Sequence, residues 1–181
     1  KKELITILKK ENLENINEAV GIREAFHKSG EILSSFRMVE EKQLVEKLFK
    51  QINSHTGLGT YGLDEIIDLL KNNVVDTVLI TDDIGLYRLE KKCKRCQTIE
   101  EIIVEQSKKI VQKTELINKP CSDCKSQDLE VTEQDVIEYI SLLGTKTGAK
   151  IEVISGKAEH GSMLGSLGKI GALLRYNPNL N

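Results

Sequence analysis

Two short cysteine pairs constrain the fold of this chain more than any other feature of its sequence. Cys93 and Cys96 form one C-x-x-C pair, and Cys121 and Cys124 form the second. These four are all the cysteines of the chain. Each pair can place two thiolates on one tight turn, and two such turns can complete a tetrahedron around a metal ion. We therefore predict a Cys₄ zinc site.

Zinc in such a site would have a structural role, because four thiolates leave no open position for a catalytic water molecule. The alternatives are a redox C-x-x-C motif or two local disulfides. A redox motif is expected at a helix N-terminus, whereas the pattern around these pairs indicates short strands. The segment 88–131 is too small to bury much apolar area alone. Metal binding would then supply much of its folding free energy, on the order of 10 kcal/mol.

The composition is that of a soluble globular protein, with 39% hydrophobic and 30% charged residues. The formal net charge of −2 gives no global bias toward nucleic acid. The sequence shows neither a membrane-spanning apolar run nor a signal peptide, so we expect a cytoplasmic protein without a membrane partner. Because the chain begins at Lys1 inside a helical pattern without an initiator Met, we expect a fragment of a longer protein.

Apolar periodicity predicts alternating helices and strands on both sides of the cysteine segment. Helices are expected at residues 1–10, 17–36, 39–52, 63–70 and from Thr132 to about residue 143. Strands are expected at 74–81, 84–90, 99–104, 110–111, 150–155 and 170–176, with a Gly-rich connection before the last.

This layout predicts an α/β fold, namely a layered α-β-α sandwich with an inserted small β-rich, zinc-ribbon-like minidomain and an N-terminal helical segment. The expected domains are the helical segment at residues 1–38 and the α/β domain at 39–181. The zinc-binding insertion occupies residues 88–131 within the α/β domain.

Two further clusters are candidate sites with a structural alternative. Gly57, Gly59 and Gly62 could cradle a phosphate, but no Walker-type Lys-Ser/Thr accompanies them and no strand precedes them. We favour a flexible loop that leads into a helix. Asp82 and Asp83 could bind a metal ion, but no further hard ligand follows them. An exposed turn after a strand is the favoured interpretation.

The three histidines do not indicate catalysis. They are His27, His55 and His160, and only His160 has an acid and a serine beside it, in residues 159–162 (Glu-His-Gly-Ser). Residues adjacent in sequence seldom form a catalytic triad, and no nucleophile elbow is present. We therefore predict that the chain has no catalytic residue and is not an enzyme.

The basic residues of the insertion, within 91–95 and at 108–109, could contact RNA phosphates. Glu100, Glu101 and Glu105 are interspersed among them and carry the opposite charge. We therefore favour a solvated surface over direct affinity for RNA.

Several stretches of the chain carry a family resemblance. Residues 56–62 (Thr-Gly-Leu-Gly-Thr-Tyr-Gly) open a helix that leads to a strand at 75–80 (Val-Asp-Thr-Val-Leu-Ile). Much later come residues 159–162 and then 164–176 (Leu-Gly-Ser-Leu-Gly-Lys-Ile-Gly-Ala-Leu-Leu-Arg-Tyr). Together they resemble the C-terminal domain of the class I translation termination factors of archaea and eukaryotes, the peptide chain release factor subunit 1 family. Residues 1–38 are similar to the end of the family's middle domain, and an inserted zinc minidomain at this place resembles the archaeal branch.

This resemblance implies a non-enzymatic interaction module of the ribosome's termination machinery. In the family, an N-terminal domain reads stop codons and a Gly-Gly-Gln loop of the middle domain directs peptidyl-tRNA hydrolysis, and neither motif occurs in this chain. The C-terminal domain docks a translational GTPase that acts as the class II release factor, and later the ABC-type ATPase that recycles the ribosome. From the Gly-rich segment we predict a partner-binding surface at Gly161, Ser162, Gly165, Gly168, Gly171, Arg175 and Tyr176.

Two alternative functions remain open from the sequence. The same domain occurs in the paralogous Pelota-type ribosome-rescue factors. The implied fold also resembles that of kink-turn-binding ribosomal proteins, so an RNA-binding module is the alternative from another class.

Overall fold

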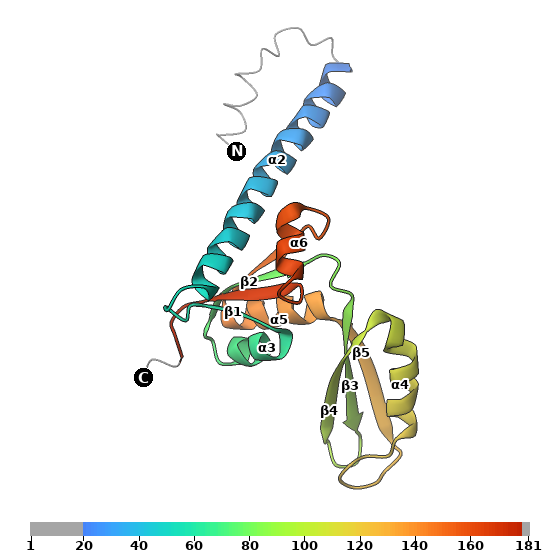
Figure 1. Ribbon diagram of the computed structural model, residues 1–181. Coiled ribbons are helices and arrows are strands. Elements are labelled where there is room, and N and C mark those ends of the chain that lie inside the picture. Colours follow the sequence, from blue (N-terminus) through green and yellow to red (C-terminus); the bar gives the residue numbers. More distant parts are fainter. Residues whose placement is uncertain (1–19, 179–181) are drawn as a thin grey trace. The chain divides into compact units, whose positions relative to one another are not determined.

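The computed structural model describes residues 20–178 (Figure 1). The chain divides into two compact units, Lys1–Gln43 and Leu44–Asn181. The described part of the first unit is helix α2, which spans Val20–Ile52 and so continues into the second unit. The helix expected at residues 1–10 lies outside the described residues.

Helix α2 is continuous, so the expectation of two separate helices that meet near residue 38 was wrong. An ion pair between Arg37 and Glu41, at 2.9 Å, lies one helical turn apart at the expected break and favours the helix there. The expected domain boundary at residue 38 thus falls inside α2.

The second unit contains a four-stranded sheet in the order β1-β7-β2-β6. Its strands are β1 (Gly59–Tyr61), β2 (Val75–Thr81), β6 (Lys150–Ile154) and β7 (Ile170–Leu174). Strand β2 runs parallel to β6 and antiparallel to β7, and β1 pairs antiparallel with β7. The short edge strand β1 lies in the stretch where the sequence suggested a loop.

Helices cover both faces of this sheet. Helices α3 (Leu63–Lys71) and α5 (Val136–Thr147) share one core with Val78 and Ile80 of β2. Helix α6 (Glu159–Gly165) and the last turns of α2 share a second core with Leu79, which lies between those two residues on β2. Because successive side chains of a strand point to opposite faces, the sheet lies between two helical layers. The predicted α-β-α sandwich is confirmed.

Helix α6 lies in the Gly-rich stretch that the sequence predicted as an irregular connection. A Cβ at Gly161 would lie 2.0 Å from the carbonyl oxygen of Ser155, so only glycine lets α6 pack this closely against the end of β6. Here glycine marks a close approach inside a helix rather than a loop.

The cysteine segment builds a second, antiparallel sheet in the order β4-β3-β5. Its elements are β3 (Leu86–Cys93), β4 (Ile99–Glu105), the 3₁₀ helix η1 (Gln106–Lys108), α4 (Lys109–Asn118) and β5 (Leu129–Asp135). At the base of this sheet, Leu86 and Ile103 pack against the α3–α5 core.

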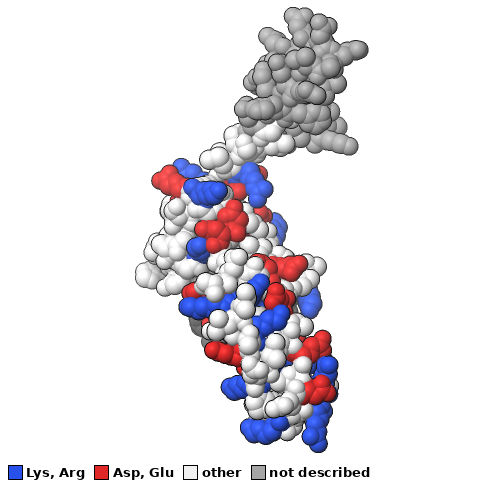
Figure 2. All heavy atoms as spheres, turned by 90° about the vertical axis from the view of Figure 1, so that its right-hand side faces the viewer, with Lys and Arg blue, Asp and Glu red and all other residues white. Residues whose placement is uncertain are grey.

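Two boundaries in this region differ from the prediction. A strand was expected at residues 110–111, but they belong to helix α4. Helix α5 begins at Val136 rather than Thr132, because β5 continues to Asp135. The Asp135 carboxylate accepts the backbone N–H of Ile137 at 2.8 Å and caps α5. Over the face shown in Figure 2, acidic and basic side chains are interspersed, in keeping with the small net charge of −2.

Candidate metal centre

Both C-x-x-C pairs fold into the same kind of turn. The backbone N–H groups of Cys93 and Cys121 donate to the carbonyls five residues along, at 2.9 and 3.0 Å. The N–H groups of Gln97 and Lys125, each directly after its second cysteine, donate back to the carbonyls of Cys93 and Cys121 at 2.9 and 3.2 Å. Gln97 and Lys125 both adopt positive φ, at 64° and 56°. Two unrelated sequences therefore form matching turns, which we call the first and second knuckle (residues 93–97 and 121–125).

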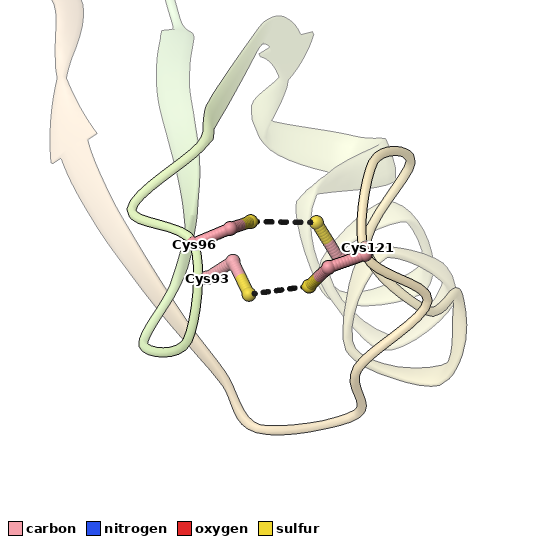
Figure 3. A group of neighbouring side chains, drawn as sticks. Cys93, Cys96 and Cys121 are labelled. Carbon is pink, nitrogen blue, oxygen red and sulfur yellow. Dashed lines mark hydrogen bonds between the residues drawn. The ribbon is translucent and has the colours of Figure 1, made fainter.

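The two knuckles aim their sulfurs at one another (Figure 3). The Sγ atoms of Cys93 and Cys124 are 3.5 Å apart, as are those of Cys96 and Cys121, and all four lie within 4.8 Å of one another. Disulfide sulfurs would be about 2.05 Å apart, so these are four free thiols. Four sulfurs bound to zinc at about 2.3 Å form a tetrahedron with edges of about 3.8 Å. The cluster fits a Cys₄ zinc ion in both donor chemistry and size.

The surroundings of the cluster shift the pKa values of two of its thiols in opposite directions. Hydrogen bonds from the side chain and backbone of Thr98 lower the pKa of Cys96 to about 6. A hydrogen bond from the backbone of Ser126 also lowers the pKa of Cys124. The neighbouring thiols, first that of Cys96, outweigh this effect and raise the pKa of Cys124 to about 12. Crowded thiolates repel one another, and a divalent cation between them would remove that penalty.

An ion pair between a buried lysine and a partly exposed glutamate ties the second knuckle to the sheet. Lys91 of β3 has only 2% of its side chain exposed, and its Nζ lies 2.9 Å from a carboxylate oxygen of Glu100 on β4. The same carboxylate accepts the backbone N–H of Ser122 at 3.3 Å, inside the second knuckle. The Lys91 ammonium holds the pKa of Glu100 below its usual range. The sequence analysis did not predict that Lys91 is the buried partner of Glu100, because Lys91 lies in a run of basic residues that was interpreted as a solvated surface.

The seven residues of the predicted partner-binding surface do not form one patch. Gly161 and Gly171 are buried, while Ser162, Gly168 and Tyr176 are exposed. Arg175 donates to the carbonyl of Asn73 at 3.3 Å and to that of Thr147 at 3.0 Å. It therefore stabilises the end of the sheet opposite to α6. The exposed members on α6 and those after β7 are separated by the length of β7.

The other candidates have structural partners. The Asp82 carboxylate accepts the N–H of Gly156 at 2.9 Å, and Asp83 pairs with Lys169 at 3.1 Å. His160 is buried in α6, whereas Ser162 is exposed and donates its hydroxyl to the backbone carbonyl of Ala158, the N-cap residue of α6, at 3.3 Å. His27 lies among residues whose side chains are not described.

Fold and site together define a class of protein, a three-layer α/β domain with a β-rich insertion that ends in a four-cysteine cluster. The family model described as eRF1 domain 3 matches residues 38–178. The chain therefore belongs to the eRF1 domain 3 family.

Curated relatives include proteins named peptide chain release factor subunit 1. The protein of that name from Methanocaldococcus jannaschii is 33% identical over 161 residues, which cover 88% of this chain and 38% of the relative. The one from Thermococcus onnurineus is 34% identical over 157 residues, or 86% of this chain and 37% of the relative. The chain thus spans well under half the length of these relatives.

Among solved structures, the C-terminal domain of a peptide chain release factor from Methanosarcina mazei is similar over 92% of this chain and 100% of that one, with 26% identity and a TM-score of 0.77. Pelota from Archaeoglobus fulgidus is similar over 90% of this chain and 38% of that one, with 20% identity and a TM-score of 0.52. The likeness to Pelota shows a shared fold alone. Within residues 20–178, no helix is both long and apolar enough to cross a membrane.

Proposed function

We propose that this chain is the C-terminal interaction domain of a class I peptide chain release factor that acts in translation termination. The match to eRF1 domain 3 over residues 38–178 carries this proposal. Among solved structures, the release-factor domain from Methanosarcina mazei has a TM-score of 0.77 and 26% identity, against 0.52 and 20% for Pelota, which favours a termination factor over a rescue factor. Curated relatives named as release factors are 33–34% identical to the chain.

In this proposal the domain is a non-enzymatic docking module of the cytoplasm. It binds the translational GTPase that acts as class II release factor and, afterwards, the ABC-type ATPase that recycles the ribosome. Stop-codon reading and peptidyl-tRNA hydrolysis belong to the part of the relatives that this chain does not match, which is about three fifths of their length. The exposed residues Ser162 and Tyr176 are its candidate contacts.

The test is a titration of the 181-residue chain with a purified archaeal elongation-type GTPase, followed by calorimetry. We expect saturable binding. Because Ser162 and Tyr176 lie at opposite ends of β7, Ser162→Arg and Tyr176→Ala test two separate surfaces. The variant whose residue is a central contact should weaken binding about tenfold, or about 1.4 kcal/mol. Leu142→Ala is the matched control, because Leu142 is exposed at 51% on the opposite helical layer. Absence of binding, by this chain and by the full-length factor, would reject the docking function.

We further propose that the cluster of Cys93, Cys96, Cys121 and Cys124 binds one structural zinc ion. The distances within 4.8 Å among all four sulfurs support this assignment. Elemental analysis of protein purified without chelators should give a zinc to protein ratio near one. A ratio near zero, in protein that still refolds fully, would reject it.

A further inference from the structure

Strand β4 forms an open edge of the insertion's sheet (Figure 1). The strand order is β4-β3-β5, so β4 (Ile99–Glu105) has β3 as its single partner among the described strands. The carbonyl of Thr98 accepts the N–H of Cys93 at 2.9 Å, and the N–H of Gln106 donates to the carbonyl of Gly85 at 3.0 Å. Even-numbered residues of β4 therefore face β3, because successive residues of a strand direct their backbone groups to opposite sides. The residues whose backbone groups face outward are Ile99, Glu101, Ile103 and Glu105.

An edge strand of this length and composition usually carries protection against pairing. Four of the seven residues of β4 are isoleucine or valine, and Ile99 is 50% exposed. The usual protective devices are a proline, a lysine, a bulge or a covering element. Strand β4 contains neither Pro nor Lys, and its register against β3 runs without a shift. Helix α4 is tied to the opposite edge strand, β5, because Lys109 and Lys113 both pair with Glu133.

The glutamates of β4 give its edge little net charge, because each has a cationic partner in the insertion. The pairs, at 2.9, 2.6 and 3.1 Å, are Glu100 with Lys91, Glu101 with Arg88, and Glu105 with Lys108. A glutamate without a partner would repel a second strand that carries acids of its own. Balanced in this way, the glutamates leave a β-branched edge that another strand can approach.

We propose that the β4 edge pairs with the β4 edge of a second copy of this chain. A two-fold axis brings the same surface of both copies together and makes the two β4 strands antiparallel. The three-stranded sheets of the two insertions then join into one continuous sheet. Such a dimer goes beyond the proposed function, because neither the GTPase nor the ribosome takes part in it.

The positions of the glutamates select one register for this pairing. With Ile102 on the two-fold axis, Glu101 lies opposite Ile103 of the second copy, and Glu105 lies opposite Ile99. Sliding one strand by two residues is the smallest shift that keeps the outward backbone groups paired. Either direction of this shift places Glu101 opposite a glutamate, namely Glu101 or Glu105 of the second copy. Like charges directly opposite destabilise a sheet, so the strand is complementary to itself in the first register.

The other exposed apolar surface of the insertion lies on α4 and is less suited to self-association. Ile110, Val111 and Ile117 are each more than half exposed, but a ten-residue helix is only about 15 Å long. The backbone of a helix is hydrogen-bonded within the helix, so α4 offers side chains alone. The β4 edge offers side chains together with outward backbone groups, which add main-chain hydrogen bonds to the contact.

The test is sedimentation equilibrium of the 181-residue chain at concentrations up to about 1 mM. One strand pairing is smaller than a standard interface, so we expect a dissociation constant of about 0.1–1 mM. Ile99→Glu should weaken the dimer about fivefold, because it creates two like-charged pairs with Glu105 across the two-fold axis. Ile99→Lys should tighten it by a similar factor, since the new cation faces Glu105. Ile99→Glu/Glu105→Lys should restore the affinity of the parent.

The matched control is Ile117→Glu, which makes the same change at a similarly exposed isoleucine of α4, 53% exposed. It should dimerise as the parent does. If it weakens the dimer while Ile99→Glu does not, α4 is the contact and the proposal is wrong. A parent chain that stays monomeric up to the highest concentration would also overturn it.

Amide exchange locates the contact directly. As the concentration rises, the outward amides of Glu101 and Ile103 should gain protection, whereas the amides of α4 should not change. Protection gained along β5 instead would assign the dimer to the other edge of the sheet and would overturn the proposal.

Discussion

Lys91 shows how one side chain holds the insertion together. Its ammonium is buried and paired with Glu100, whose carboxylate also holds the second knuckle through Ser122. In Glu100→Gln the buried cation loses its counter-charge, and we expect the insertion to lose about 1–2 kcal/mol of stability. Glu130→Gln, an exposed change on the neighbouring strand β5, should stay within about 0.5 kcal/mol. Urea unfolding followed by insertion-specific amide signals measures both, and equal effects would contradict this role.

The same ion pair predicts a dependence on pH. The pKa of Glu100 is lowered in the folded chain by Lys91, so its contribution is present above the pKa of the unfolded carboxyl and is lost as the pH falls through the folded value. A protonated glutamic acid resembles glutamine. The difference in unfolding free energy between the parent and Glu100→Gln should therefore be full at pH 7 and shrink toward pH 3. A difference that stays constant over this range would show that the charge of Glu100 does not matter.

Gly171 tests whether a glycine of the predicted partner surface acts in packing. A Cβ there would lie 2.4 Å from a methyl carbon of Leu48, which is fully buried in the α2–α6 core. Gly171→Ala should cost about 1–3 kcal/mol through overpacking. A Cβ at Gly165, the last residue of α6, meets no atom within 4 Å, so Gly165→Ala should be neutral or slightly stabilising. Thermal unfolding that ranks the two variants the other way would reject this explanation.

At the scale of elements, the sequence predicts features that depend on the spacing of nearby residues. It does not predict a helix whose polar face packs on a sheet and whose apolar residues face solvent. The four cysteines were found because the ligands of a zinc knuckle must be close in sequence. Helix α4 was missed because its polar face packs on the sheet, where Lys113 pairs with Glu133 at 2.8 Å. Its apolar residues Ile110 and Ile117 are 77% and 53% exposed. A helix identified by an apolar stripe that faces the core cannot be found in such a segment.

The insertion as an element should depend on its cysteines. In Cys93→Ser/Cys96→Ser only two thiolates remain, and the proposed metal binding, which would supply on the order of 10 kcal/mol of folding free energy, would be lost. Amides of β3, β4 and β5 should then lose protection from exchange, while those of β2 and β7 keep theirs. Ser122→Ala, beside a ligand but not one itself, is the control and should change little. Loss of protection in both sheets together would show that the cluster stabilises the whole domain.

At the scale of the whole molecule, the insertion has two ends of different character. Its base belongs to the α/β sandwich, since Leu86 and Ile103 pack against the α3–α5 core. The guanidinium of Arg88, also on β3, lies 4.6 Å from the ring centroid of Tyr139 on α5. Its far end has no such support and is closed by the knuckles. Removal of the far end should therefore leave the sandwich folded.

A hairpin variant tests whether the proposed GTPase docking needs the insertion, because the candidate contacts Ser162 and Tyr176 belong to the α/β sandwich. Cys93 and Leu129 are partners across β3 and β5, so a two-residue Asn-Gly turn can replace residues 94–128, together with Cys93→Thr. The loss of Ile103 should cost the core about 1–3 kcal/mol. We expect calorimetry to show GTPase affinity within about threefold of the parent, a change of less than about 0.7 kcal/mol. If a folded hairpin variant loses its affinity for the GTPase, the insertion contributes to docking and the assignment of the docking site to the sandwich alone is wrong.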